Sequence, residues 1–477
     1  MNADAEVAPG FIDDIDLSRT RQLTIEPGWS VDWHKLIKYG VKRTYYDDLL
    51  KRCNPAMMKS LSAPLLKVHM PILLQMRNLT SITLELKNQS WSDFIPHLVM
   101  LPKLQVMHIQ ARGSLSSDQF RLITDHCPGL TSFSFPGECR WNTDPFLSVL
   151  KETTIRKISP WSGLGGSDTQ SIQSLITVLT DLPDLIDFEL YLKMHPSSEL
   201  NEEYVNKLHR LPDLLAQHKT LRRMAIFVCS DVTRAEMHNF VNNFDMASHF
   251  DFVELLESVP KLEELMISGL EMSPMVCRAV GNLTCLKTIM LSDIEVVDGF
   301  GSMFDNDTLE SITLARPFRS HFNQHGVAEL MFGFAAMSSL KHVTELTLNL
   351  PTEELRMELL VINDLIRNAV LEFLNKGASR RLIRLSLTGS WVNNQLIKDM
   401  PVMDALERLN LTPYDAFHDE HYSLPNGLLQ RETYANEMEL SAQAVITFAR
   451  QKCPFLLQPL FLRHNSLLRK RFVNINK

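Results

Sequence analysis

The sequence predicts an α/β solenoid in which short parallel strands line a concave face and helices return along the outside. A phrase of the form L-x-x-L-x-L recurs along the chain, for example Leu130-x-x-Phe133-x-Phe135. Proline before the phrase, as in Cys127-Pro128, ends the outer helix and favours an extended backbone. The middle apolar residue recurs at intervals of 25, 26 and 25, at Ile82, Met107, Phe133 and Ile158. This period and core predict a leucine-rich-repeat solenoid, a curved right-handed array.

The middle position of the phrase continues through most of the chain. Within each repeat, a strand with alternate buried residues leads into a turn, such as Ser268-Gly269, and then into an amphipathic outer segment. Some steps are longer, so we expect inserts near residues 196–211, 230–252 and 414–439. Further middle residues are Phe188, Met224, Leu265, Ile289, Ile312, Leu346, Leu385, Leu409 and Leu460.

The ends of the chain are less regular than the array. Residues 21–25 and 66–70 alternate like strands, and residues 32–39 are typical of a helix. We therefore divide the chain into an N-terminal cap of atypical repeats (1–75), the solenoid (76–462) and a basic C-terminal tail (463–477).

Composition narrows the class of protein. The 477 residues carry a formal net charge of -8, which argues against nucleic acid as a partner, because phosphate binding needs a basic face. The chain has no apolar run long enough to span a membrane, and its acidic start lacks the pattern of a signal peptide. Its seven cysteines form no C-x-x-C pair, which favours reduced thiols. We expect a cytoplasmic or nuclear protein with no membrane partner.

The Cys127-Pro128-x-Leu130 approach to a strand resembles the cysteine-containing repeats of F-box/leucine-rich-repeat proteins. Residues 21–25, 32–39 and 41–43 are also similar to the segment that follows the F-box in many fungal members. The resemblance implies recognition of a target for a cullin–RING ubiquitin ligase, with a ligase adaptor as a further partner. The resemblance covers nearly the whole chain, although residues 1–18 contain no recognisable F-box.

The concave face is the predicted site for a protein partner. One and three positions past each middle residue, side chains point to this face, and they are nearly free of charge; His108 is its only basic candidate. Aromatic rings and methionines are enriched in the cores of interfaces. Two alternatives to a partner-binding site stay open: a long insert could fold over the rings and methionines of this face and bury them, or the strand alignment could be shifted. The predicted partner-binding residues are Trp161, Tyr191, Phe227, Met266 and Met290.

No catalytic motif or cofactor-binding motif is present, so the sequence predicts a scaffold without enzymatic activity, cofactor or metal. His321 and His325 have helical metal-ligand spacing but lack a third ligand, and we interpret them as surface residues. Three other functions stay open. The first is a regulator of a GTPase or other enzyme, for which Arg316 or Arg319 would act at a rim. The others are a free-standing scaffold with no ligase link and a sensor of a small ligand.

Overall fold

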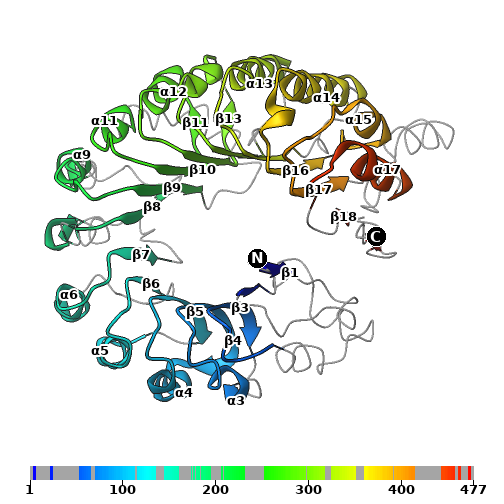
Figure 1. Cartoon of the computed structure of the whole chain (residues 1–477). Coiled ribbons are helices and arrows are strands. Elements are labelled where there is room, and N and C mark those ends of the chain that lie inside the picture. Colours follow the sequence, from blue (N-terminus) through cyan, green and yellow to red (C-terminus); the bar gives the residue numbers. More distant parts are fainter. Residues whose placement is uncertain are drawn as a thin grey trace, which may run out of the picture. The chain divides into compact units, whose positions relative to one another are not determined.

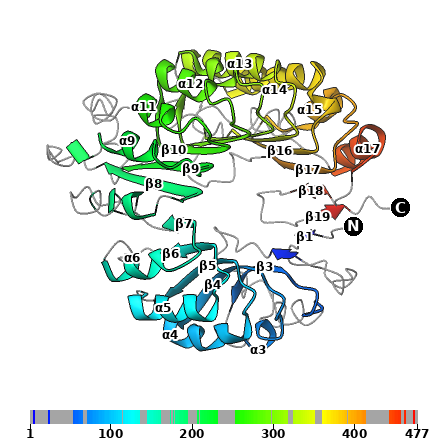
Figure 2. The ribbon, with the colours of Figure 1, turned by 60° about the vertical axis from the view of Figure 1, so that its left-hand side comes forward.

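The structure is a computed structural model that divides into two compact units. Unit 1 comprises Met1–Lys193 and Leu200–Arg210, and unit 2 comprises Met194–Glu199 and Leu211–Lys477. In each unit a largely parallel sheet carries its helices along one side (Figures 1 and 2). The structure describes residues 4–6, 22–24, 53–65, 70–112, 115–135, 144–160, 173, 176–177, 179–182, 184–194, 206–207, 209–230, 252–296, 298–316, 324–350, 359–389, 391–413, 442–456, 460–462 and 471–473.

Unit 1 is a run of parallel strands in chain order. The strands are β1 (Asp4–Glu6), β2 (Gln22–Thr24), β3 (Ser60–Leu65), β4 (Ser81–Ser90), β5 (Val106–Arg112), β6 (Ser132–Phe135), β7 (Lys157–Pro160) and β8 (Asp187–Met194). The helices between them are α3 (Met70–Leu73), α4 (Trp91–Phe94), the 3-10 helix η2 (Ile95–Met100), α5 (Ser117–His126) and α6 (Asp144–Lys151).

Local sequence explains where these helices begin. Ser116 caps α5 in a capping box, since its hydroxyl accepts from the Gln119 N–H while the Gln119 side chain accepts from the Ser116 N–H. The apolar face of α5 then buries Phe120, whose ring centroid lies 5.1 Å from that of Phe133 on β6. The middle residue of the repeat thereby joins strand and helix into one core.

Unit 2 continues the same pattern. Its main-sheet strands are β9 (Arg223–Ser230), β10 (Glu264–Ser268), β12 (Thr288–Ser292), β14 (Ser311–Ala315), β15 (Glu345–Asn349), β16 (Arg384–Gly389), β17 (Arg408–Pro413), β18 (Leu460–Leu462) and β19 (Arg471–Val473). Of the described strands in this list, β19 alone runs antiparallel to its neighbour, β18. Two short strands, β11 (Glu271–Met272) and β13 (Glu295–Val296), form a separate parallel pair.

The helices of unit 2 lie on one side of its sheet, as Figure 1 shows from green to orange. Ser273 caps α12, and Pro274 occupies its first turn, where its missing N–H is harmless. The helices are α9 (Leu211–Leu215), α11 (Phe252–Glu257), α12 (Pro274–Gly281), η4 (Phe300–Phe304), α13 (Gln324–Met337), α14 (Leu359–Asn375), η5 (Ala378–Arg380), α15 (Asn394–Asp399) and α17 (Ala442–Lys452).

The register confirms the predicted repeat and its leucine-rich-repeat fold. In unit 1 the pairs Ile82–Met107, Met107–Phe133, Phe133–Ile158 and Ile158–Phe188 lie opposite one another on neighbouring strands. In unit 2 the matched residues are Met224, Leu265, Ile289, Ile312, Leu346, Leu385 and Leu409. These side chains of unit 2 are all buried. Steps of 23 to 41 residues therefore preserve the same register, because the extra residues lie between strands.

The first strands differ from the sequence-based expectation. Most of the strand predicted at residues 66–70 lies outside the described residues. Met70 belongs to α3, and the described strand that precedes it is β3 (Ser60–Leu65). Leu61, not Val68, lies opposite Ile82. Pro64 lies within β3 and weakened its strand signal in the sequence. β2 falls within the predicted strand at 21–25, whereas the helix expected at 32–39 lies outside the described residues.

Candidate functional site

The candidate site is the side of each sheet that faces away from the helices, which we call the open face. Alternation places every second strand residue there: on β14, Ile312 and Leu314 are buried, while Thr313 between them is partly exposed. In unit 2 the residues next to the buried middle positions form a row across the sheet. That row comprises Ala225, Met266, Met290, Thr313, Thr347, Ser386 and Asn410.

Three predicted residues lie together on this face of unit 2, and we call them the methionine patch: Phe227, Met266 and Met290. Met266 lies directly opposite Met290 on the adjacent strand, so their backbones are about 4.8 Å apart. Phe227 lies opposite Ser268, two residues further along β10. Met290 is 37% exposed, and Phe227 and Met266 are half-buried. The patch therefore offers apolar surface to solvent on three consecutive strands.

The other two predicted residues belong to a different part of the chain. Tyr191 lies in β8 of unit 1, and its side chain lies outside the described residues. Trp161 follows β7 and is outside the described residues altogether, as are His321 and most of the three predicted inserts. The aromatic run of Trp161, Tyr191 and Phe227 therefore stays a prediction.

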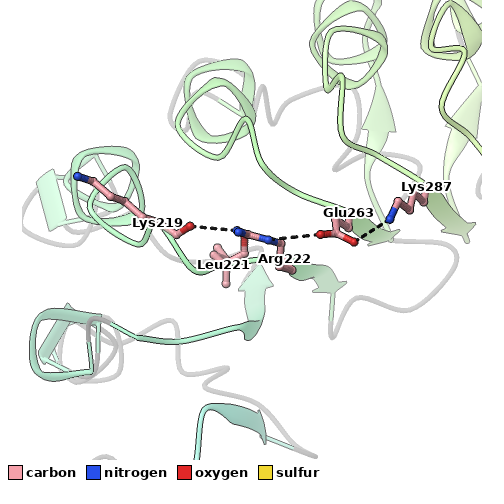
Figure 3. A network of polar contacts seen from close by, with 5 residues as sticks. All are labelled: Lys219, Leu221, Arg222, Glu263 and Lys287. Carbon is pink, nitrogen blue, oxygen red and sulfur yellow. Dashed lines mark hydrogen bonds and ion pairs between the residues drawn. The ribbon is translucent and has the colours of Figure 1, made fainter.

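Ion pairs flank the methionine patch at the beginning of its strands. Arg222, Glu263 and Lys287 precede β9, β10 and β12, and Figure 3 shows them as one chain of contacts. Glu263 forms an ion pair with Arg222, whose Nε lies 3.4 Å away, and accepts a hydrogen bond from Lys287 Nζ at 3.2 Å. The Nη1 of Arg222 also donates to the carbonyls of Lys219 and Leu221. A second pair, Arg223–Glu264, lies one residue further on. These charges largely compensate one another, so this edge gives the patch little net charge.

Backbone strain marks the opposite edge, where the strands end. Asp293 and Arg316 follow β12 and β14 directly, and both have a φ of 48°, in the left-handed region. For residues with a side chain this region costs roughly 1–2 kcal/mol. Arg316 Nη1 lies 3.5 Å from Asp293 Oδ1, and the side chains are 65% and 45% exposed. The sequence singles out Arg316 as a candidate rim residue but does not reveal its pairing with Asp293, although Ser268-Gly269, Ser292-Asp293 and Ala315-Arg316 recur at repeat spacing. Arg319 lies outside the described residues.

The open face of unit 1 carries the one basic residue predicted there. His108 Nδ1 lies 2.5 Å from Ser134 Oγ on the neighbouring strand, and the donor depends on the histidine tautomer. A histidine beside a serine is the arrangement that activates a nucleophile. Ser134, however, is only 2% exposed, so its hydroxyl is shielded from a substrate in solvent. The geometry is that of a structural hydrogen bond between two strands.

The part of the chain that the structure describes contains neither a metal-binding cluster nor a membrane-spanning helix. Within the ranges given above, no three His, Cys, Asp or Glu side chains gather closely enough to hold a metal ion. The described helices are also too short or too polar to cross a membrane.

Comparison with known proteins gives similarity at the level of solved structures. No family model and no curated protein matches the chain. It is similar to a chain in the crystal structure of a Rad7 and Elc1 complex from yeast, with a TM-score of 0.39 and 15% identity over 84% of this chain and 91% of that one. It is also similar to a chain of a TLR13–ssRNA13 complex, with a TM-score of 0.34 and 13% identity over 74% of this chain and 48% of that one.

Proposed function

We propose that this chain is a non-enzymatic protein-recognition scaffold that binds a protein partner on the open face of its repeats. The observation that carries the proposal is the methionine patch, since Met266 and Met290 present apolar side chains on neighbouring strands. Burying such residues under a partner gains free energy without breaking hydrogen bonds of the sheet. Compensated charges at the edge in Figure 3 would form the polar rim that usually surrounds an interface core.

Trp161 and Tyr191 extend the proposed binding residues into unit 1. Both are large rings of the kind that dominate interface energetics. We propose that residues 1–75 cap the first repeats, that 76–462 form the binding array and that 463–477 follow it as a basic segment. The net charge of -8 supports a protein partner over nucleic acid.

The first test replaces both methionines by glutamate, as Met266→Glu/Met290→Glu, and selects ligands from a displayed library of random linear peptides. Wild type is expected to enrich peptides with Leu, Met or aromatic residues. The double variant should bind those peptides at least about tenfold more weakly, a loss of roughly 1.4 kcal/mol. The matched control is Met275→Glu, since Met275 is 56% exposed on α12, on the helical side.

Unchanged peptide binding by Met266→Glu/Met290→Glu, with thermal unfolding like wild type, contradicts the site. Equal losses in that variant and in Met275→Glu contradict it as well, because a general increase in negative charge would then explain both. An absence of any apolar consensus on the wild-type chain contradicts the scaffold proposal itself.

We also propose a place for the scaffold, as the target-recognition part of a cullin–RING ubiquitin ligase acting in the cytoplasm or nucleus. This rests on the resemblance of its Cys-Pro repeats, such as Cys127-Pro128, to F-box/leucine-rich-repeat proteins. The test mixes the full chain with a purified cullin adaptor and measures co-elution. Co-elution supports the ligase link. Its absence, with peptide selection intact, leaves a free-standing scaffold and contradicts that link alone.

A further inference from the structure

The turns after β10, β12 and β14 each place one left-handed residue at the same position of the repeat. Gly269 has a φ of 78°, and Asp293 and Arg316 have a φ of 48°. The N–H of each residue donates to the last residue of the next strand: Gly269 to Ser292 at 3.1 Å, Asp293 to Ala315 at 3.0 Å and Arg316 to Asn349 at 2.8 Å. Leu350, at the same position after β15, makes the equivalent bond to Thr388 at 3.0 Å without a positive φ, so this bond does not by itself require the left-handed conformation.

Glycine is the residue that fits such a position without strain, and Gly269 shows that the repeat accepts it. Asp is tolerated in the left-handed region, whereas Arg is uncommon there. The one contact that the two charged side chains make with each other is an exposed ion pair at 3.5 Å, which stabilises a fold little. Stability therefore does not explain why charged side chains occupy these turns, and strain of this kind is found at binding sites.

The position of the pair relates it to the methionine patch. Asp293 follows Met290 by three residues, which is about 10 Å along a strand. β12 and β14 are neighbours in the sheet, so Arg316 lies one strand further on at the same edge. An extended segment bound along β12 over Met290 would end at this pair.

We infer that Asp293 and Arg316 form a charged lip that sets the specificity of the methionine patch for an extended protein segment. The segment carries an apolar side chain over Met266 and Met290, an acidic side chain opposite Arg316 and a basic side chain opposite Asp293. A guanidinium can bind a carboxylate through two parallel hydrogen bonds. The Arg316 side chain is 65% exposed, so a partner can reach its guanidinium. Such charges choose between partners more than they add affinity. This inference rests on the proposed function.

Two double variants test the lip with the same random peptide library. Asp293→Gly/Arg316→Gly keeps the left-handed backbone, removes both charges and relieves the strain. It should melt at a higher temperature than wild type and lose the preference for charged residues while keeping the apolar consensus. Asp293→Arg/Arg316→Asp exchanges the two charges between the same turns and so keeps the ion pair. It should melt like wild type and select peptides in which the acidic and basic positions are exchanged.

The outcomes separate the two proposals. If wild type yields an apolar consensus whose flanking charges are unchanged in both double variants, the charged lip is wrong and the methionine patch stands. A lower melting temperature for the glycine variant also contradicts the inference, because the side chains would then serve the fold. If no apolar consensus appears on wild type, the proposed function fails first.

Discussion

Individual cysteines show how repeat position determines side-chain chemistry. Cys127 and Cys453 end outer helices and precede prolines, and Cys277 lies within α12; all three are buried. Burial disfavours the thiolate, so it raises the pKa of Cys127 from 9.0 to about 11, and those of Cys277 and Cys453 to about 12. Cys277 Sγ also donates to the Met272 carbonyl at 3.3 Å. These thiols serve as small apolar core groups.

We therefore predict a sharp split in thiol reactivity at pH 8. Iodoacetamide should modify the exposed Cys285 within minutes, while Cys127, Cys277 and Cys453 should react only after unfolding in urea. Peptide mass spectrometry over a time course measures each site. Modification of any of the three at the rate of Cys285 in the native protein would contradict the burial that the structure shows.

The same thiols make stability depend on alkaline pH. Their pKa values in the folded state exceed the ordinary 9.0, so above about pH 9 the unfolded chain releases protons that the folded chain keeps. Their contribution to stability is complete below pH 9 and declines as the pH rises toward 11 or 12. Replacing Cys277 by Ala should weaken this decline relative to wild type.

Two glycines lie at the contact between η4 and α13 in unit 2, Gly301 and Gly333. A methyl group added to Gly333 would lie 2.7 Å from Cδ1 of Phe300, a fully buried ring that would have to shift. A methyl group added to Gly301, on the other side of the contact, would lie 3.4 Å from the Phe332 carbonyl oxygen, which is ordinary contact. Close approach of the two elements thus requires glycine at one position only.

Gly333→Ala should consequently destabilise unit 2 even though alanine favours a helix by roughly 1 kcal/mol over glycine. Overpacking of a core costs about 1–3 kcal/mol, so we expect a net loss near 1 kcal/mol. Urea unfolding followed by circular dichroism measures it, with Gly301→Ala as the matched control. A Gly333→Ala variant as stable as its control would show that the Phe300 ring moves freely.

The sequence predicts strand register better than it predicts the first strands or the conformation of the turns. The register of the strands was predictable, because Leu265, Ile289 and Ile312 occupy the same position of the apolar repeat and lie opposite one another on neighbouring strands. β3 was not predicted, because Pro64 hides its strand character. Arg316 was predicted only as a possible rim residue. The left-handed φ angles of Asp293 and Arg316 were not predictable from their residue types, and only their alignment with Gly269 could have indicated them.

At the scale of the whole molecule, each of the two units is built of stacked repeats. Each strand pairs with its neighbours in the sheet, and the aromatic cluster of Trp91, Phe120 and Phe133 lies entirely within unit 1. Stability in such an array is close to a sum of repeat terms and nearest-neighbour terms. Damage to one core layer should therefore remain near the site of damage.

Hydrogen exchange measures this directly, with one core truncation in each unit. Phe133→Ala removes a fully buried ring of unit 1, and Ile312→Ala removes a buried branch of unit 2. Losses of about 3 kcal/mol are expected for each, which raise the exchange of affected amides about a hundredfold. Phe133→Ala should expose amides of β5 to β7 while β12 to β15 keep their protection, and Ile312→Ala should do the converse. Equal loss of protection in both units from either substitution would mean that the chain unfolds as one cooperative body, in which case the methionine patch would respond to mutations far outside its own repeats.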